Sequence, residues 1–136
     1  MPATGPDLTL PLILCRIGLV TPYELEERAA DAPNVMVVDI AGELDLTNAE
    51  DVERRLEALS ADSASAVVLD VNRVLFIDSA ALHVLFRTAR RLGRDRFGLV
   101  LDPNGAIART LEIVRISEVA TVAGSPDELV PLLAVT

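Results

Sequence analysis

The sequence predicts an α/β fold: a mostly parallel sheet of four to five strands, with one antiparallel edge strand and about four helices. Short apolar runs with β-branched residues alternate along the chain with longer segments whose apolar residues recur at helical spacing. Strands that alternate with helices of this length form parallel units with right-handed crossovers. The first two expected strands are separated by only a short turn, which favours an antiparallel pair at one edge.

Composition indicates one globular domain with an acidic surface. The chain has 136 residues, a hydrophobic fraction of 51% and a formal net charge of −9, so it can bury a proper core. An acidic surface argues against nucleic acid as the main partner, because phosphate contacts dominate that affinity. Cys15 is the only cysteine, which excludes an internal disulfide and a multi-cysteine metal site. We therefore expect a cytoplasmic protein that needs no cofactor or metal.

Residues 1–21 form an N-terminal extension, and we expect the domain to occupy residues 22–136. The apolar part of the extension, Leu8–Val20, contains Pro11 and Arg16 and is too short to insert into a membrane as a span. It is either an extra strand or helix packed on the domain, or a self-association surface that would make a homodimer. The first interpretation is favoured, since large exposed apolar patches are rare on monomers.

The domain should begin with a hairpin. Tyr23–Arg28 shows the weak alternation of an edge strand. Val35–Ile40 is apolar on both faces except at Asp39, as expected for a buried second strand.

A helix should follow and run to about Leu59. The segment Gly42-Glu43-Leu44-Asp45 leads into it, and Thr47 and Glu50 have the spacing of a capping box. Its inward positions would be Val52, Leu56 and Leu59.

The central stretch predicts a strand followed directly by a helix. Ala66–Leu69 is an apolar run, and a turn at Asn72–Arg73 separates it from a second run, Val74–Ile77. From Ser79 the spacing becomes helical, with an apolar stripe of Leu82, Leu85, Phe86, Ala89 and Leu92. Ser79 therefore lies in the first turn of a helix that begins where a strand ends, an edge at which open α/β sheets usually meet ligands and partners.

The C-terminal third predicts two more strands and two more helices. Phe97–Leu101 and Val119–Ala123 are the expected strands. The helix between them should begin near Asp102-Pro103-Asn104. A final helix should begin at Ser125-Pro126 and pack through Leu129, Leu132 and Leu133.

Three motifs, in this order, resemble the STAS domain family of the anti-sigma factor antagonist type. The segment Phe76-Ile77-Asp78-Ser79-Ala80-Ala81-Leu82 is similar to the family pattern that opens a helix after an apolar strand. Gly42-Glu43-Leu44-Asp45 resembles the loop after the second strand, and Asp102-Pro103-Asn104 resembles the Asn-Pro opening of the next helix. The resemblance extends from about Tyr23 to the C-terminus and implies the STAS fold.

The resemblance implies a non-enzymatic regulator of transcription. Such an antagonist binds a serine-kinase anti-sigma factor when unphosphorylated, which frees a sigma factor. Phosphorylation ends this binding, and a phosphatase restores it by removing the phosphate. Ser79 matches the phosphorylated serine, although pattern alone favours a helix-cap serine. The resemblance implies partner contacts at Asp45, Leu46, Thr47, Asn48, Asp78, Ala80, Ala81 and His83.

The chain departs from the family pattern beside Ser79. Ala80 replaces a second serine, so that Ser79 is the only acceptor in the motif, and Ala81 replaces a glycine. Arg73 stands where many members have glycine, and His83 replaces a small residue. These departures bear on which partner binds.

Two alternatives stay open. The chain could be a STAS subunit of a lipid-transport or stress-sensing complex, in which Ser79 is not phosphorylated. It could also be a small hydrolase that uses Ser79 and His83, four residues apart on one helix face. The hydrolase is the least favoured, because a nucleophile also needs an orienting group and an oxyanion hole, and the chain has no Gly-x-Ser-x-Gly elbow.

Overall fold

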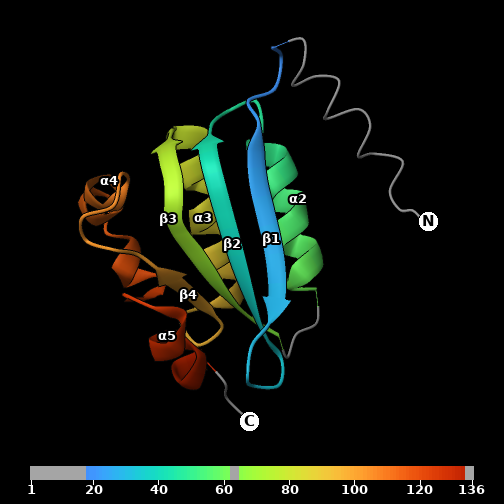
Figure 1. The fold of residues 1–136 in the computed structure, drawn as a ribbon, viewed down its shortest axis with the longest axis vertical. Coiled ribbons are helices and arrows are strands. Elements are labelled where there is room, and N and C mark those ends of the chain that lie inside the picture. Colours follow the sequence, from blue (N-terminus) through green and yellow to red (C-terminus); the bar gives the residue numbers. More distant parts are fainter. Residues whose placement is uncertain (1–17, 62–64, 134–136) are drawn as a thin grey trace, which may run out of the picture.

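A computed structural model describes residues 18–61 and 65–133. These residues form a five-stranded sheet in the order β1-β2-β3-β4-β5 (Figure 1). β1 is antiparallel to β2, and each of the other neighbouring pairs is parallel. The predicted fold class is therefore confirmed. The expectations for residues 1–17 lie outside the described residues.

The strands are β1 (Tyr23–Ala29), β2 (Val35–Leu44), β3 (Ala66–Ile77), β4 (Phe97–Val100) and β5 (Thr121–Ala123). The helices are α2 (Ala49–Leu59), α3 (Ser79–Leu92), α4 (Ala108–Ile113) and α5 (Pro126–Leu133), with a short 3₁₀ helix at Ile116–Glu118. Each helix of residues 18–61 and 65–133 is too short or too polar to cross a membrane.

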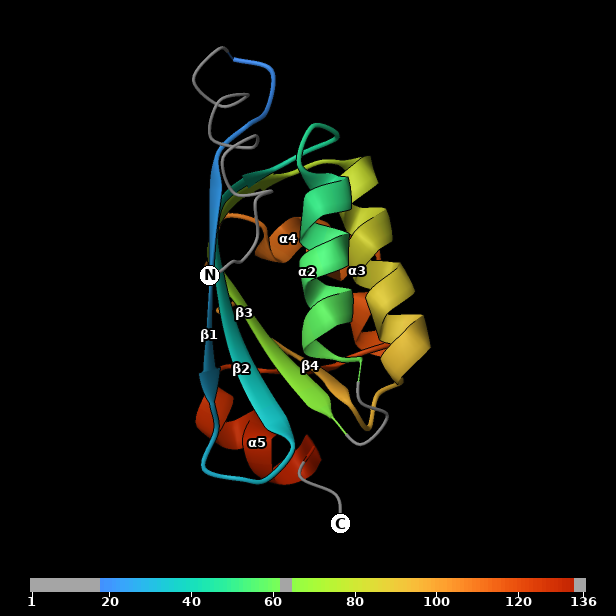
Figure 2. The ribbon, with the colours of Figure 1, turned by 90° about the vertical axis from the view of Figure 1, so that its right-hand side faces the viewer.

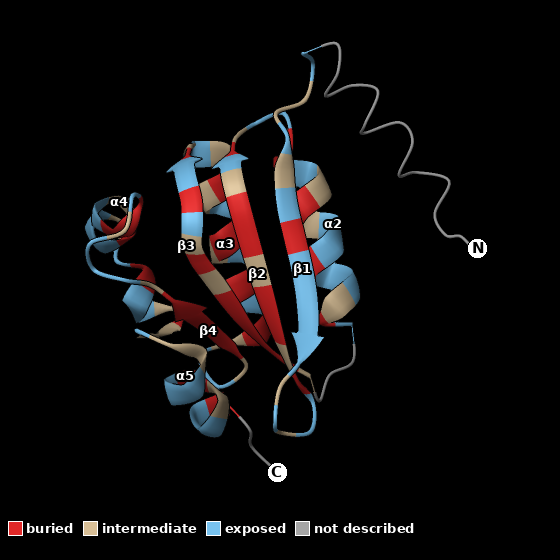
Figure 3. Cartoon of the chain, in the orientation of Figure 1, coloured by how far each residue is buried: buried red, intermediate tan, exposed pale blue. Residues whose placement is uncertain are grey.

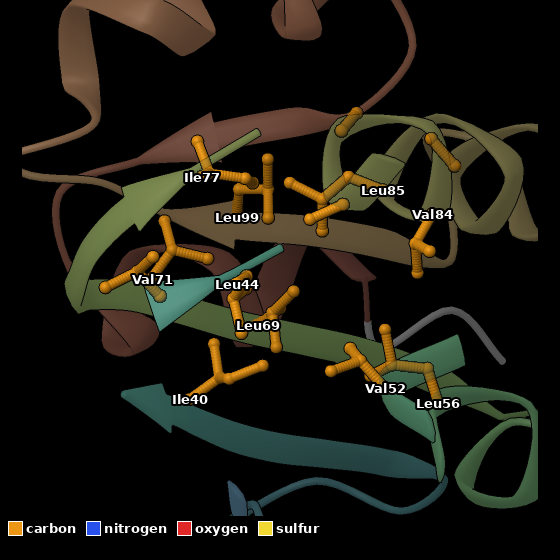
Figure 4. Close-up of a cluster of buried hydrophobic side chains, with 14 of the residues drawn as sticks. Ile40, Leu44, Val52, Leu56, Leu69, Val71, Ile77, Val84, Leu85 and Leu99 are labelled. Carbon is orange, nitrogen blue, oxygen red and sulfur yellow. The ribbon is translucent and has the colours of Figure 1, made fainter. Parts of the chain in front are cut away.

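The sheet is covered by α2 and α3 on one face and partly by α5 on the other (Figure 2). The larger core lies under α2 and α3, where Leu56 and Leu85 meet strand residues such as Leu69 (Figure 4). A smaller core lies under α5, where Leu129 packs near Val37 and Val68. Burial is highest along the central strands, whereas much of β1 is exposed (Figure 3).

The turn predicted at Asn72–Arg73 is wrong, because β3 is one continuous strand from Ala66 to Ile77. Its register with β2 shifts twice, from Asp39↔Asp70 to Ala41↔Arg73 and from Gly42↔Val74 to Glu43↔Phe76. At each shift β3 has one residue more than β2, which is a β-bulge. Asn72 and Arg73, whose polar side chains suggest a turn in the sequence, lie at the first bulge.

The helices differ from the expectations in four details, the first being that α4 begins at Ala108 and not near Asp102-Pro103-Asn104. The capping box of Thr47 and Glu50 is wrong: Asn48 is the N-cap and makes no side-chain cap bond, while the Thr47 hydroxyl donates to Asp45. On α3, Leu82 and Phe86 are only partly buried, and the buried set is Ala81, Val84, Leu85, Thr88, Ala89 and Leu92. Leu132, predicted to pack α5 against the domain, is 61% exposed.

The α3 stripe supports a stability prediction. Leu85 is 2% exposed, so Leu85→Asp places an unpaired charge in the larger core. We expect a loss of about 3–5 kcal/mol of unfolding free energy, a large part of the stability of a small domain. A circular dichroism melt measures this loss. His83→Asp, at an exposed position on the same helix, is the control and should melt near wild type. Equal melting temperatures for the two variants would contradict the assigned core.

Candidate partner-binding surface

The carboxyl ends of β2 and β3 bring the loop at residues 45–48 beside the start of α3. The two strands run parallel, and their last paired residues are Leu44 and Ile77. The backbone N–H of Asp78 then donates to the carbonyl of Leu44 over 3.1 Å. Because parallel strands end at the same edge of a sheet, motifs that are distant in sequence meet there.

The carboxylate of Asp78 joins the two segments. Its Oδ1 accepts a hydrogen bond from the backbone N–H of Ala81 at 3.0 Å, which caps α3. Its Oδ2 accepts a hydrogen bond from the backbone N–H of Leu46 at 2.9 Å. One side chain thus fixes both the first turn of the helix and the position of the loop.

Ser79 is the first residue of α3 and is exposed. No hydrogen bond of its hydroxyl to another residue of the described segments is present. The cap of α3 is supplied by Asp78 and not by Ser79. The hydroxyl is therefore available to a partner, and the helix does not depend on it.

Asn48 organises the loop from inside. Its side chain is fully buried, with an exposed fraction of 0%. Its Oδ1 accepts from the backbone N–H of Asp45 at 3.0 Å, and its Nδ2 donates to the carbonyls of Thr21 and Glu43, each at 2.9 Å. All three hydrogen bonds go to the backbone, so Asn48 connects the loop to β2 and to the residues before β1.

Thr21 is the residue that sequence reasoning missed. Its backbone N–H donates to the Thr47 hydroxyl oxygen at 2.9 Å, and its own hydroxyl donates to Asp45 Oδ2. Together with the bond from Asn48, these contacts fasten the chain just before β1 to the loop. Thr21 is 24 residues from Asp45 in sequence, so no local pattern predicts that it contacts the loop. The contact depends on the pairing of β1 with β2.

Hydrogen bonds also control the ionisation of Asp45. Partial burial alone would raise the pKa of the carboxyl, but the hydroxyls of Thr21 and Thr47 and the backbone N–H groups of Thr47 and Asn48 favour its charged form. The net result is a pKa below the ordinary value of 3.8. The Asp45 carboxylate is therefore a charged acceptor within the loop.

A second contact fixes the start of β1 near this loop. The Tyr23 hydroxyl donates to Asp51 Oδ2 at 2.6 Å, and the Arg55 guanidinium lies 5.6 Å from the centre of the Tyr23 ring. Burial of the phenol and its bond to Asp51 raise the pKa of Tyr23 to about 12. The interaction holds β1 against α2.

The remaining predicted site residues divide by exposure. Leu46, Thr47 and His83 are exposed, and Ala80 is half-buried. Ala81 is 4% exposed, with its methyl group in the larger core. His83 makes no hydrogen bond to Ser79 in the described part of the chain, and no group of metal-ligating side chains is found in that part.

Comparisons with known proteins agree with this geometry. The STAS domain family matches residues 28–129. The anti-sigma-F factor antagonist RsfB of Mycobacterium tuberculosis is 33% identical over 89 residues, which are 65% of this chain and 71% of RsfB.

Solved structures show the same fold. An anti-sigma factor antagonist from Mycobacterium paratuberculosis has a TM-score of 0.67 at 27% identity, over 81% of this chain and 94% of that chain. The Bacillus cell fate determinant SpoIIAA in its phosphorylated form has a TM-score of 0.55 at 17% identity, over 81% of this chain and 97% of its own. At that identity the likeness to SpoIIAA concerns the fold alone.

The buried amide of Asn48 predicts a large effect of its removal. Asn48→Ala leaves two backbone carbonyls and one N–H without their partner. Since a buried unsatisfied group costs about 1–3 kcal/mol and water can reach part of the loop, we expect a loss of about 2–4 kcal/mol. Urea denaturation measures it. Asn104→Ala, at an exposed asparagine, is the matched control, and equal midpoints for the two variants would refute the role of Asn48.

The lowered pKa of Asp45 predicts an acid-dependent stability. The folded state binds this proton less tightly than the unfolded state, so the stabilisation is complete above the ordinary pKa of 3.8 and is lost as the pH falls through the folded value. Asp45→Asn removes this contribution. Its unfolding free energy should therefore fall less steeply than that of wild type below about pH 5. Denaturant titrations at several pH values measure both slopes, and parallel curves would contradict the assignment.

Proposed function

This chain belongs to the STAS domain family, and we propose that it is an anti-sigma factor antagonist that acts through the surface around Ser79. The observation that carries the proposal is the exposed Ser79 hydroxyl at the start of α3, held beside the loop at residues 45–48 by Asp78. The identity with RsfB supports the choice of partner class. The partner is an anti-sigma factor that is also a serine kinase, and the complex forms in the cytoplasm.

Ser79 is the phosphoacceptor in this proposal. A phosphate at the first residue of a helix faces the unpaired N–H groups of the first turn and the positive end of the helix dipole, so the fold tolerates it. A phosphoserine adds a charge of about −1.5 to −2. Asp45 and Asp78 already place carboxylates at this edge. Phosphorylation therefore makes an acidic surface more acidic without unfolding the domain.

The predicted contact residues have two different roles. Leu46, Thr47 and His83 touch the partner directly, because they are exposed around Ser79. Asn48 and Ala81 are buried and position the loop and the first turn of α3. Asp45, Asp78 and Ala80 are intermediate in exposure and contribute to both.

The test is the effect of charge at Ser79. A pull-down from native lysate with unmodified chain identifies the anti-sigma factor, and titration calorimetry then measures its affinity. Ser79→Asp puts a negative charge at a helix N-terminus, where it stabilises by about 0.3–1 kcal/mol. The variant should melt at or slightly above the wild-type temperature. It should lose most of its affinity, because the new charge would meet an acidic or desolvated patch of the partner, and like charges across an interface cost several kcal/mol.

Ser79→Ala is the control and should keep both stability and affinity. Early melting of Ser79→Asp would show that the serine is structural. Wild-type affinity of Ser79→Asp would show that charge at this position is not the switch. Capture of transport or stress-complex subunits in place of an anti-sigma factor would support the alternative STAS assembly.

A further inference from the structure

Three large apolar side chains are exposed at the edge of the sheet that carries Ser79. Leu46, Leu75 and Phe76 are 76%, 67% and 50% exposed. We call these three residues the apolar patch. Leu46 follows β2 and is hydrogen-bonded to Asp78, two residues beyond Phe76. The three residues therefore lie at neighbouring strand ends.

The second bulge of β3 explains why two of these side chains face solvent. Val74 and Ile77 are both buried under the helices. In a regular strand, side chains alternate between the two faces of the sheet, so Phe76 would point to the same face as Val74, toward the helices. The extra residue opposite Glu43 lets both Leu75 and Phe76 stay out of the core. The exposure is thus a feature of the backbone.

The same part of β3 has an open edge. β4 pairs with residues Val67–Asp70 of β3 and with no later residue. Within the described residues, the end of β3 therefore has a strand neighbour only on the β2 side, and Figure 1 shows β4 beside the lower half of β3 alone. A strand edge without a strand neighbour, beside apolar side chains, is a template for an added extended segment.

The N-terminal extension has the chemistry and the length to occupy this place. Residues 8–17 are apolar except for Thr9 and Arg16, and Arg16 complements the acidic residues Glu43 and Asp78 at this edge. Ten extended residues span about 33 Å, whereas the seven residues from Val71 to Ile77 span about 23 Å. Pro11 is compatible with an edge strand.

The extension also joins the domain close to the apolar patch. Thr21 is fastened to the loop at residues 45–48 by three hydrogen bonds, and this loop is joined to Asp78. Leu19, two residues upstream, is 61% exposed. A segment tethered by so short a linker has an effective concentration on the order of millimolar at its site. Weak intrinsic contacts are then enough for docking.

We propose that residues 8–17 dock on their own domain, as an extended segment over the apolar patch and along the open edge of β3. The docked segment covers the surface that contains Ser79. A consequence, which rests on the proposed function, is that the extension and the anti-sigma factor compete for this surface.

The single cysteine makes the docking measurable in the full chain. A nitroxide attached to Cys15 broadens the NMR signals of nearby amides. We expect strong broadening at Leu46, Leu75 and Phe76 and little at Leu129, a buried residue of α5 in the smaller core. Absence of broadening at the apolar patch, or equal broadening over the whole domain, would overturn the proposal.

Substitutions at exposed positions provide the controls. The double variant Leu75→Ser with Phe76→Ser should lose the broadening at Leu46 and keep its melting temperature. Leu132→Ser changes an equally exposed leucine on α5 and should leave the broadening unchanged. Because the label itself could disturb docking, hydrogen exchange at Phe76 is compared between unlabelled wild type and a variant with Leu12→Ser and Leu14→Ser. Faster exchange in the variant supports docking, and equal exchange overturns it.

Two further experiments distinguish docking within one chain from docking of a second copy, and test competition with the anti-sigma factor. A mixture of ¹⁵N-labelled chain and nitroxide-labelled ¹⁴N chain should show no broadening at the patch, and broadening there would mean that a second copy docks instead. With the purified anti-sigma factor, Leu12→Ser with Leu14→Ser should bind severalfold tighter than wild type. Equal affinity overturns competition, whereas failure of both forms to bind refutes the proposed function and leaves the docking result standing.

Discussion

The geometry of the site depends on one carboxylate. Asp78 accepts hydrogen bonds from Ala81 and Leu46 at once, so the start of α3 and the loop after β2 form one unit. Without this side chain, the first turn of α3 would lose its cap and the loop its link to β3. Because Asp78 supplies the cap, Ser79 is released from that role and presents its hydroxyl to solvent. Because the cap of α3 does not involve the Ser79 hydroxyl, a change at that hydroxyl leaves the cap in place.

The loop itself is supported from two sides. Asn48 fills the space beneath it and satisfies three backbone groups, while Thr21 and Tyr23 tie the start of β1 to the loop and to α2. These contacts are mostly hydrogen bonds to the backbone, so they fix position more than they add apolar burial. A surface built in this way is held in place by the domain and is continuous with the chain that enters β1.

Sequence reasoning predicted most of the fold because periodicity reports burial. The start of α3 after a strand, most of its apolar stripe and the hairpin of β1 and β2 all follow from local spacing. The continuity of β3 could not be predicted, because Asn72 and Arg73 look like a turn and only pairing with β2 converts them into a bulge. The capping box at Thr47 failed for a similar reason: its hydroxyl bonds to Asp45, within a network that Thr21 joins from outside the loop.

The most direct measurement is the phosphorylation of unmodified chain by its anti-sigma factor with ATP, read by intact mass and peptide mapping. The account predicts a single added phosphate, located on Ser79, an unchanged melting temperature and release of the partner. Phosphate on another residue, or a phosphorylated Ser79 that leaves the complex intact, would contradict it.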